Sequence, residues 1–334
     1  MRATASEPSP RRPRPPLRRW SWGRVLSLAL PVLTGCASAP PRAPIAEYEV
    51  HTDGPFTSVQ AAVDAAVAGG VPARIRIGPG TWRGVVDVPP GAPPVHVVGA
   101  GMASTVLVDG RSASHIDPRT GRAYGTYGSA TMTVRSDDFR AERLTIENDA
   151  GPVGQAVALV VDGTRAAFDQ VQILGHQDSL YLRTAGSRVW FRDCRIEGSV
   201  DYIFGAATAL FDGCALLSLG NGYVTAASTP ADQAYGFVFR RCRLSAAVGV
   251  SRVYLGRPWR PHAAALFVDC ALDAPVPDPG WHDWDKPDAR ATARFGNVDG
   301  RGANGAFLPE APWAPDAPDV PTPEQLFGDW RPFE

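Results

Sequence analysis

Two aspartates, Asp178 and Asp201, occupy the same place in a recurring sequence pattern. Each lies ten residues after a phenylalanine, Phe168 or Phe191, that opens the motif F-x-x-[E/V/C]-x-[L/I]. If the segments stack in register, the two residues lie side by side, about 4.8 Å apart at the backbone. Two carboxylates that close do not both ionise easily, so one keeps its proton, as a proton donor beside a nucleophile or base would. The alternative is a pair of turn or surface carboxylates, because Asp is common in turns.

The motif recurs, and its period predicts the elements that must position these aspartates. Steps of 20 to 29 residues separate its six starting points, which are Phe139, Phe168, Phe191, Phe211, Phe239 and Phe267. A unit of this length, with short alternating apolar runs, indicates a solenoid. Each coil of a solenoid buries its apolar face only against its neighbours. We therefore predict an all-β fold, a right-handed parallel β-helix.

The segments around the repeats predict a few further elements. Residues Phe56–Val67 have apolar side chains at helical spacing, with Thr57 or Ser58 as N-cap, and this helix is expected to cap the N-terminal end of the solenoid. The repeats run to about Leu272, and Pro323–Phe327 is a candidate for a short helix. Short strands between Gly or Pro turns are expected at Arg74–Ile77, Val85–Val88, Val95–Val98 and Thr105–Val108.

The N-terminal segment predicts export. A basic, Pro-rich stretch precedes the apolar run Val25–Leu33, which is far shorter than the roughly 20 residues of a membrane-spanning helix and is typical of a signal peptide. The sequence Leu-Thr-Gly-Cys that ends at Cys36 resembles a bacterial lipobox. We expect a lipoprotein signal over residues 1–36 with Cys36 acylated, a Pro/Ala linker over 37–47, and a catalytic domain over 48–334. The alternative is an ordinary cleaved signal with a chance cysteine.

Charge limits the partners that this chain can bind. The first 35 residues carry seven arginines and one glutamate, so their removal takes the formal net charge from −1 to −7. An acidic chain is not expected to bind nucleic acid. We expect a monomer that is tethered to a membrane through Cys36, as an outer-membrane lipoprotein; otherwise the protein is periplasmic or secreted.

Four cysteines follow the repeat. Each lies three residues after a motif phenylalanine, at Cys194, Cys214, Cys242 and Cys270. Stacked coils would place neighbouring Cα atoms within the range of a disulfide, and exported proteins keep disulfides. We expect a Cys194–Cys214 bond, with Cys242–Cys270 as the weaker candidate. The alternative is that all four are small apolar residues in equivalent core positions.

Five segments, in this order, closely resemble the pectin methylesterases. They are SATMTV at 129–134, QAVAL at 155–159, GHQDSLY at 175–181, GSVDYIFG at 198–205 and YLGRPW at 254–259. The resemblance covers roughly residues 48–334. It implies a parallel β-helix, hydrolysis of the C6 methyl esters of galacturonate in pectin with release of methanol, and no metal or organic cofactor.

The resemblance also implies roles for particular residues. Asp201 matches the nucleophile, Asp178 the general acid and base, and Arg257 the arginine that holds the nucleophile. Residues that match oxyanion or substrate contacts are Gln177, Gln155, Thr131 and Trp259. Apart from the resemblance, Phe204 is interpreted as a packing residue that is also expected to touch substrate. Trp281 and Trp284, residues of a type that more often packs than binds, are candidates for groove lining.

Elementary chemistry agrees with these roles, although other functions stay open. An ester carbonyl needs a nucleophile, a proton donor for the leaving alkoxide, and donors aimed at the oxyanion. A bidentate Arg257 would favour the ionised form of Asp201 and leave Asp178 protonated. One alternative is an esterase or thioesterase for another acyl group. Another is an inactive pectin-binding surface protein. A polysaccharide lyase would need Ca²⁺-binding acidic clusters, and the sequence has no such spacing.

Overall fold

The computed structural model describes residues 44–302, 305 and 319–333. The predicted signal, Cys36 and most of the predicted linker lie outside the described residues. The first strand, β1 (Ala46–Val50), begins two residues before the predicted domain boundary. Among the described residues, no helix has the length and apolar character needed to cross a bilayer.

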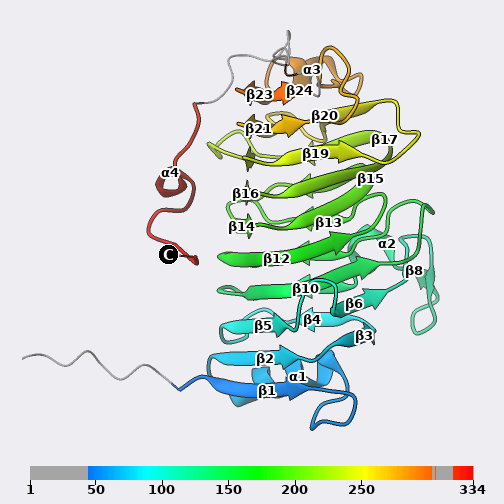
Figure 1. Cartoon of the computed structure of the whole chain (residues 1–334), viewed down its shortest axis with the longest axis vertical. Coiled ribbons are helices and arrows are strands. Elements are labelled where there is room, and N and C mark those ends of the chain that lie inside the picture. The colour runs from blue at the N-terminus through cyan, green and yellow to red at the C-terminus, as the bar shows by residue number, and fades with distance from the viewer. Residues whose placement is uncertain (1–43, 303–304, 306–318, 334) are drawn as a thin grey trace, which may run out of the picture. The chain divides into compact units, whose positions relative to one another are not determined.

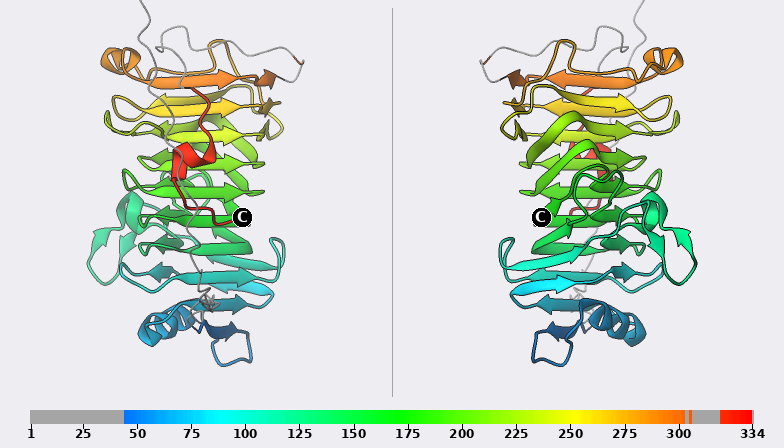
Figure 2. Two further views of the ribbon diagram at one scale, coloured as in Figure 1. Left: turned by 90° about the vertical axis from the view of Figure 1, so that its left-hand side faces the viewer. Right: turned by 90° about the vertical axis from the view of Figure 1, so that its right-hand side faces the viewer.

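The chain forms a right-handed parallel β-helix whose coils contribute strands to three rows (Figure 1, with side views in Figure 2). The first row holds β1, β2 (Ala73–Ile77), β5 (Val95–Gly99), the start of β10 (Arg140–Asn148), the start of β12 (Ala166–Leu174), β14 (Arg188–Arg192), β16 (Thr208–Asp212), β18 (Phe237–Arg240), β21 (Ala264–Val268) and β23 (Arg294–Val298). The predicted fold class is confirmed.

The other two rows continue the same coils. The second row holds β3 (Gly80–Arg83), β6 (Thr105–Asp109), the ends of β10 and β12, the starts of β15 (Arg195–Gly205) and β17 (Ala215–Ala227), β19 (Arg243–Ala246), β22 (Ala271–Leu272) and β24 (Arg301–Gly302). The third row holds β4 (Val86–Val88), β9 (Met132–Val134), β11 (Leu159–Val161), β13 (Leu180–Leu182), the ends of β15 and β17, and β20 (Val253–Pro258). A small antiparallel hairpin, β7 (Ile116–Asp117) with β8 (Arg122–Ala123), lies apart from these rows.

The repeated phenylalanines stack inside the solenoid. Phe168, Phe191, Phe211, Phe239 and Phe267 form a column with ring centroids 4.8, 4.8, 4.5 and 4.3 Å apart and nearly parallel planes. The first predicted repeat is out of register by two residues, because Ala141, rather than Phe139, pairs with Phe168. The repeats also continue one coil beyond Leu272, through β23 and β24.

A left-handed residue turns each of these coils from the first row to the second. It follows the stacked position by two residues and has φ between 51° and 66° in Arg143, Gln170, Asp193, Gly213, Arg241 and Asp269. A non-glycine residue adopts this conformation at some cost, so the surrounding strands must hold it in place. Because the corner is the same in every coil, the strands that follow it keep their register.

The predicted disulfide between Cys194 and Cys214 is wrong, and so is the weaker one between Cys242 and Cys270. All four cysteines are buried free thiols. In a parallel, in-register stack the side chains at equivalent positions point the same way, so each thiol lies beside the next and interacts with it side chain to side chain, without a covalent bond. Each thiol also contacts a backbone carbonyl of the preceding coil; Cys194, for example, lies 3.5 Å from the Phe168 oxygen.

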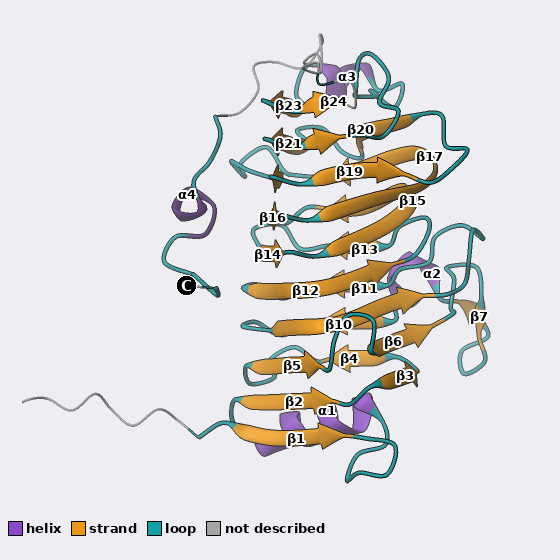
Figure 3. Cartoon of the chain, in the orientation of Figure 1, coloured by secondary structure: helices purple, strands orange, loops and turns teal. Residues whose placement is uncertain are grey.

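The helices lie at the margins of the solenoid (Figure 3). As predicted, α1 (Val59–Gly69) is capped by Ser58 and buries Val59, Ala62, Val63 and Ala66 against the N-terminal coils. The predicted helix Pro323–Phe327 is α4, which begins with a capping box. Two one-turn helices, α2 (Gly125–Gly128) and α3 (Pro287–Arg290), were not expected from the sequence.

Candidate active site

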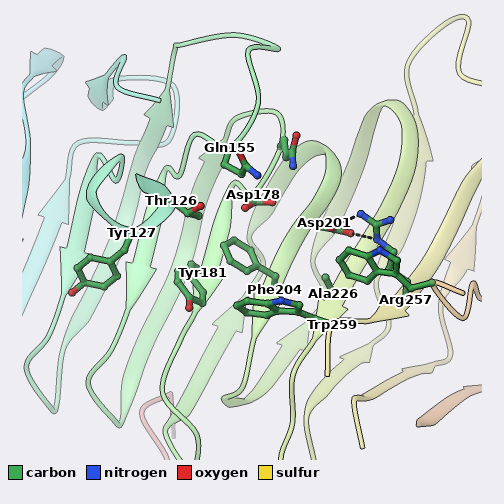
Figure 4. Close-up of a pocket in the computed structure, with 12 residues that line it drawn as sticks. Thr126, Tyr127, Gln155, Asp178, Tyr181, Asp201, Phe204, Ala226, Arg257 and Trp259 are labelled. Carbon is green, nitrogen blue, oxygen red and sulfur yellow. Dashed lines mark hydrogen bonds and ion pairs between the residues drawn. The ribbon is translucent and has the colours of Figure 1, made fainter. Parts of the chain in front are cut away.

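One pocket gathers most of the predicted site residues on the outer face of the third row (Figure 4). Its volume is about 440 Å³. Its lining is Thr126, Tyr127, Gln155, Gln177, Asp178, Tyr181, Asp201, Phe204, Ala226, Arg257, Trp259 and Trp284. Residues from coils that are far apart in sequence therefore meet because the solenoid stacks them.

Asp178 and Asp201 lie at equivalent positions of adjacent coils, as the repeat predicts. Strand β13 pairs with β15 so that Leu180 faces Ile203, and each aspartate precedes its leucine or isoleucine by two residues. The Asp178 N–H donates to the Val200 carbonyl at 3.1 Å. Both residues are buried, at 8% and 7% exposure, and both have a positive φ, 66° and 51°. Aspartate tolerates this left-handed conformation better than most residues.

Arg257 holds Asp201 with two parallel hydrogen bonds. Its Nε donates to Oδ1 at 2.9 Å and its Nη2 donates to Oδ2 at 2.7 Å (Figure 4). Both side chains are mostly buried. A bidentate pair of this kind fixes the carboxylate plane as well as its charge.

The two carboxyl groups differ electrostatically because only one of them has an arginine partner. Burial and the neighbouring charge of Asp201 raise the pKa of Asp178 to about 8. Burial also raises the pKa of Asp201, but the bonds and charge of Arg257 oppose that rise. At neutral pH, Asp178 is therefore the member of the pair that keeps its proton.

Two amides lie beside the carboxyl groups. Gln155 and Gln177 pair across adjacent coils as an isolated bridge, and the Ala156 N–H donates to the Gln177 carbonyl at 3.1 Å. Both side chains line the pocket. Within the described part of the chain, neither side-chain amide makes a hydrogen bond to another side chain, so both can donate to an oxygen of a bound ligand.

Aromatic rings form the pocket wall opposite the amides. Tyr181 and Phe204 are stacked with centroids 4.2 Å apart, and Trp259 lies 5.8 Å from Phe204 and 6.2 Å from Tyr181. Flat apolar faces of this kind suit the ring of a sugar. Trp259 and Phe204, both expected to contact substrate, line this pocket.

The structure corrects some of the predicted contacts. Thr131 is fully buried, and its hydroxyl donates to the Glu147 carbonyl at 2.8 Å, so it cannot reach a ligand in the pocket. Thr126 and Tyr127, a few residues earlier, line the pocket instead. Their nearness to the SATMTV motif was the one signal that could have found them. Trp281 is 2% exposed and stacks on Phe295, whereas Trp284 lines the pocket.

The fold and the site together define a β-helical hydrolase with a paired carboxylate centre. The sequence matches the Pectinesterase family over residues 48–315, and the chain belongs to that family. It is thus a carboxylic ester hydrolase that acts on the methyl esters of pectin.

Known relatives agree in sequence and in structure. The chain is 35% identical over 267 residues to Pectinesterase 31 of Arabidopsis thaliana, covering 78% of this chain and 84% of that protein. It superposes on the pectin methylesterase of Aspergillus niger with a TM-score of 0.76 at 28% identity, covering 86% and 96% of the two chains. A pectin methylesterase solved in complex with a hexasaccharide gives a TM-score of 0.74 at 29% identity, with 87% and 99% covered.

Proposed function

We propose that the chain hydrolyses pectin methyl esters through a covalent intermediate on Asp201, with Asp178 as general acid and then general base. The observation that carries this proposal is the unequal pair: Asp201 accepts both bonds from Arg257, while Asp178 lies beside it with a pKa of about 8. One carboxylate is thus prepared to attack and the other to give a proton.

The first half of the reaction releases methanol. An oxygen of Asp201 attacks the C6 carbonyl carbon of a methylated galacturonate, and the oxyanion that forms accepts hydrogen bonds from the amides of Gln177 and Gln155. When the carbonyl re-forms, the bond from C6 to the methoxy oxygen breaks and Asp178 protonates that oxygen. Asp201 is then joined to C6 as an anhydride, and Asp178 is ionised.

The second half restores the enzyme. Asp178 takes a proton from water, whose oxygen attacks C6 of the anhydride. The bond from C6 to the Asp201 oxygen breaks, which frees the Asp201 carboxylate and leaves galacturonic acid, whose carboxyl group then loses its proton to solvent. Trp259, Phe204 and Tyr181 support the sugar ring, and Thr126 replaces Thr131 as the candidate polar contact.

The test is methanol release by Asp201→Ala and Asp178→Ala. Each should lose about 10² to 10⁴-fold or more of the activity with the fold intact, because both groups act in the bond-breaking steps. Asp169→Ala is the matched control, since Asp169 accepts a bidentate bond from Arg192 on the first row, away from the pocket. Retention of more than a tenth of the activity by either site variant would contradict the two-carboxylate mechanism.

We also propose that Cys36 carries lipid and tethers a monomeric catalytic domain to the outer membrane. The lipobox-like sequence supports this, as does the Pro/Ala segment that separates Cys36 from β1. Cys36→Ser should release the protein from membranes or stall its processing. Recovery of the native protein as a soluble species with a cleaved, unmodified N-terminus would count against the anchor, and light scattering in detergent would test the monomer.

A further inference from the structure

Arg257 reaches Asp201 across an intervening coil. Asp201 belongs to β15 and Arg257 to β20, and β17 pairs with both of these strands. Two strand spacings separate the backbones, roughly 9–10 Å. The guanidinium therefore stands at the end of an extended side chain, and its position depends on what supports it along the way.

Two aromatic rings supply that support. The Arg257 Cζ lies 3.9 Å from the ring centroid of Tyr223, on the intervening strand β17, and 3.6 Å from that of Trp284, in the segment after β22. An arginine over an aromatic face is attracted to it, more strongly where water is excluded. These rings leave the donor edge of the guanidinium free for Asp201.

The segment that carries Trp284 is itself anchored to β20. Lys286 lies with its Nζ 3.9 Å from the Trp284 ring and donates to the carbonyls of Pro258 and Trp259, both at 3.1 Å. On the other side, the Trp284 N–H donates to Nδ1 of His282 at 2.9 Å. The His282 ring meets Tyr223 edge-on at 5.6 Å, so the two supports of Arg257 also contact each other through it.

We propose that Tyr223 and Trp284 are positioning residues that hold the Arg257 guanidinium in the orientation that ionises and aims Asp201. The proposal rests on the proposed function, in which Asp201 is the nucleophile. Tyr223 gives the clearer test, because it does not line the pocket, whereas Trp284 does. Among the described residues the Tyr223 hydroxyl has no hydrogen-bond partner, so its ring is the part that acts.

The experiment compares Tyr223→Leu with Tyr223→Phe on methylated pectin. Tyr223→Leu should lower kcat about tenfold, because a small displacement of a catalytic group is costly, while KM changes by less than about twofold. The charged groups that face Asp201 are Asp178, Arg257 and Lys286. A loosened Arg257 stabilises ionised Asp201 less, so the acidic limb of the pH–rate profile should move to higher pH. Tyr223→Phe should restore both properties.

Tyr235→Leu is the matched control. Tyr235 is another half-buried tyrosine, which packs near the C-terminal segment rather than beside Arg257. This control should leave kcat and the pH profile unchanged. In the double variant Arg257→Lys/Tyr223→Leu, the second change should add little, because both act on one interaction.

Two results would overturn the inference and leave the proposed function standing. One is Tyr223→Leu with kcat within about twofold of the parent and an unmoved acidic limb, while Asp201→Ala is inactive. The other is a loss of kcat with a lowered melting temperature, no change in the pH profile and no rescue by phenylalanine, which would mark Tyr223 as structural only. Activity in Asp201→Ala would instead refute the proposed function itself.

Discussion

Asp178 and Asp201 are identical side chains at equivalent positions, but they differ in pKa because only one of them has an arginine partner. Asp178 and Asp201 share their offset from the stacked phenylalanines and have nearly equal burial. Only Asp201 accepts the two bonds from Arg257, which reaches it from a coil two strands away. In the proposed mechanism, the division into proton donor and nucleophile is therefore set by a third residue rather than by the aspartates themselves.

The pH dependence of kcat/KM should report this division. In the proposed mechanism Asp178 gives its proton to methanol, and its pKa is raised to about 8, so activity should fall as the pH rises through about 8. The same mechanism needs ionised Asp201 as the nucleophile, and burial raises its pKa, so activity should also fall toward acid, beginning above the ordinary range of an aspartate. Rates measured from pH 4 to 10 check both limbs, and a rate that still rises above pH 9 would contradict the assignment of Asp178.

Replacement of Arg257 by lysine should not be conservative. Lysine keeps the positive charge but loses the planar fork that meets both oxygens of Asp201, and it stacks less well on Tyr223 and Trp284. We expect kcat to fall by about tenfold or more while the fold is kept. A near-normal rate, measured by methanol release, would show that only the charge of Arg257 matters.

Site residues differed in how readily the sequence revealed them. The two aspartates follow the period of the repeat, so their alignment could be predicted. Gln155, Gln177 and Arg257 were predicted as site residues from the family motifs that contain them, not from the repeat. Thr126 and Tyr127 follow the small β7–β8 hairpin, and Trp284, with φ of 59°, lies in an irregular segment. Neither place belongs to the repeat, so its period could not predict these residues.

At the level of elements, the order in which the coils stack was predictable from the sequence. The exact register of the strands was not predictable in every coil. The spacing from Phe168 to Phe267 matches the observed strand pairing. At Phe139 the apolar pattern is satisfied two residues away by Ala141, because the left-handed corner at Arg143 fixes which residue faces the column. A motif that begins with phenylalanine therefore marks Phe139, although the smaller Ala141 occupies the position in the column.

The column of thiols is a further consequence of the stacking, and it is open to measurement. Cys194, Cys214, Cys242 and Cys270 are buried, and burial raises the pKa of Cys214 and Cys242 well above the usual thiol value. The thiolate is the reactive form. Thiol reagents should therefore leave these four residues unlabelled in the folded protein and label them after denaturation. The melting temperature should not change with reductant; a clear drop would indicate a disulfide.

At the scale of the whole molecule, charge should influence the choice of substrate. Many surface arginines are paired with carboxylates of neighbouring coils, as Arg183 is with Asp162 and Arg165 with Asp138, which reduces their field. The chain without its first 35 residues has a net charge of −7. Arg260 and Lys286, beside the pocket, act in the opposite direction.

We therefore expect methyl-rich pectin to be the better substrate, because each ester removed adds a negative charge that an acidic protein repels. Moderate salt should help on de-esterified chains by screening over about 8–10 Å. Initial rates on pectins of graded methylation at two salt concentrations test this. A preference for sparsely methylated pectin at low salt would show that Arg260 and Lys286 outweigh the net charge.

The C-terminal segment gives the solenoid a connection that its repeats cannot provide. Leu326 and Phe327 of α4 pack on Trp190, Leu210 and Val238, which belong to three successive coils. Arginines of β10 and β14 donate to carbonyls of the same segment. Coils coupled only to their neighbours can melt one at a time from an end. A segment that contacts several coils at once makes their unfolding cooperative. The middle of this molecule, where the two aspartates lie, should therefore unfold last and in a single step.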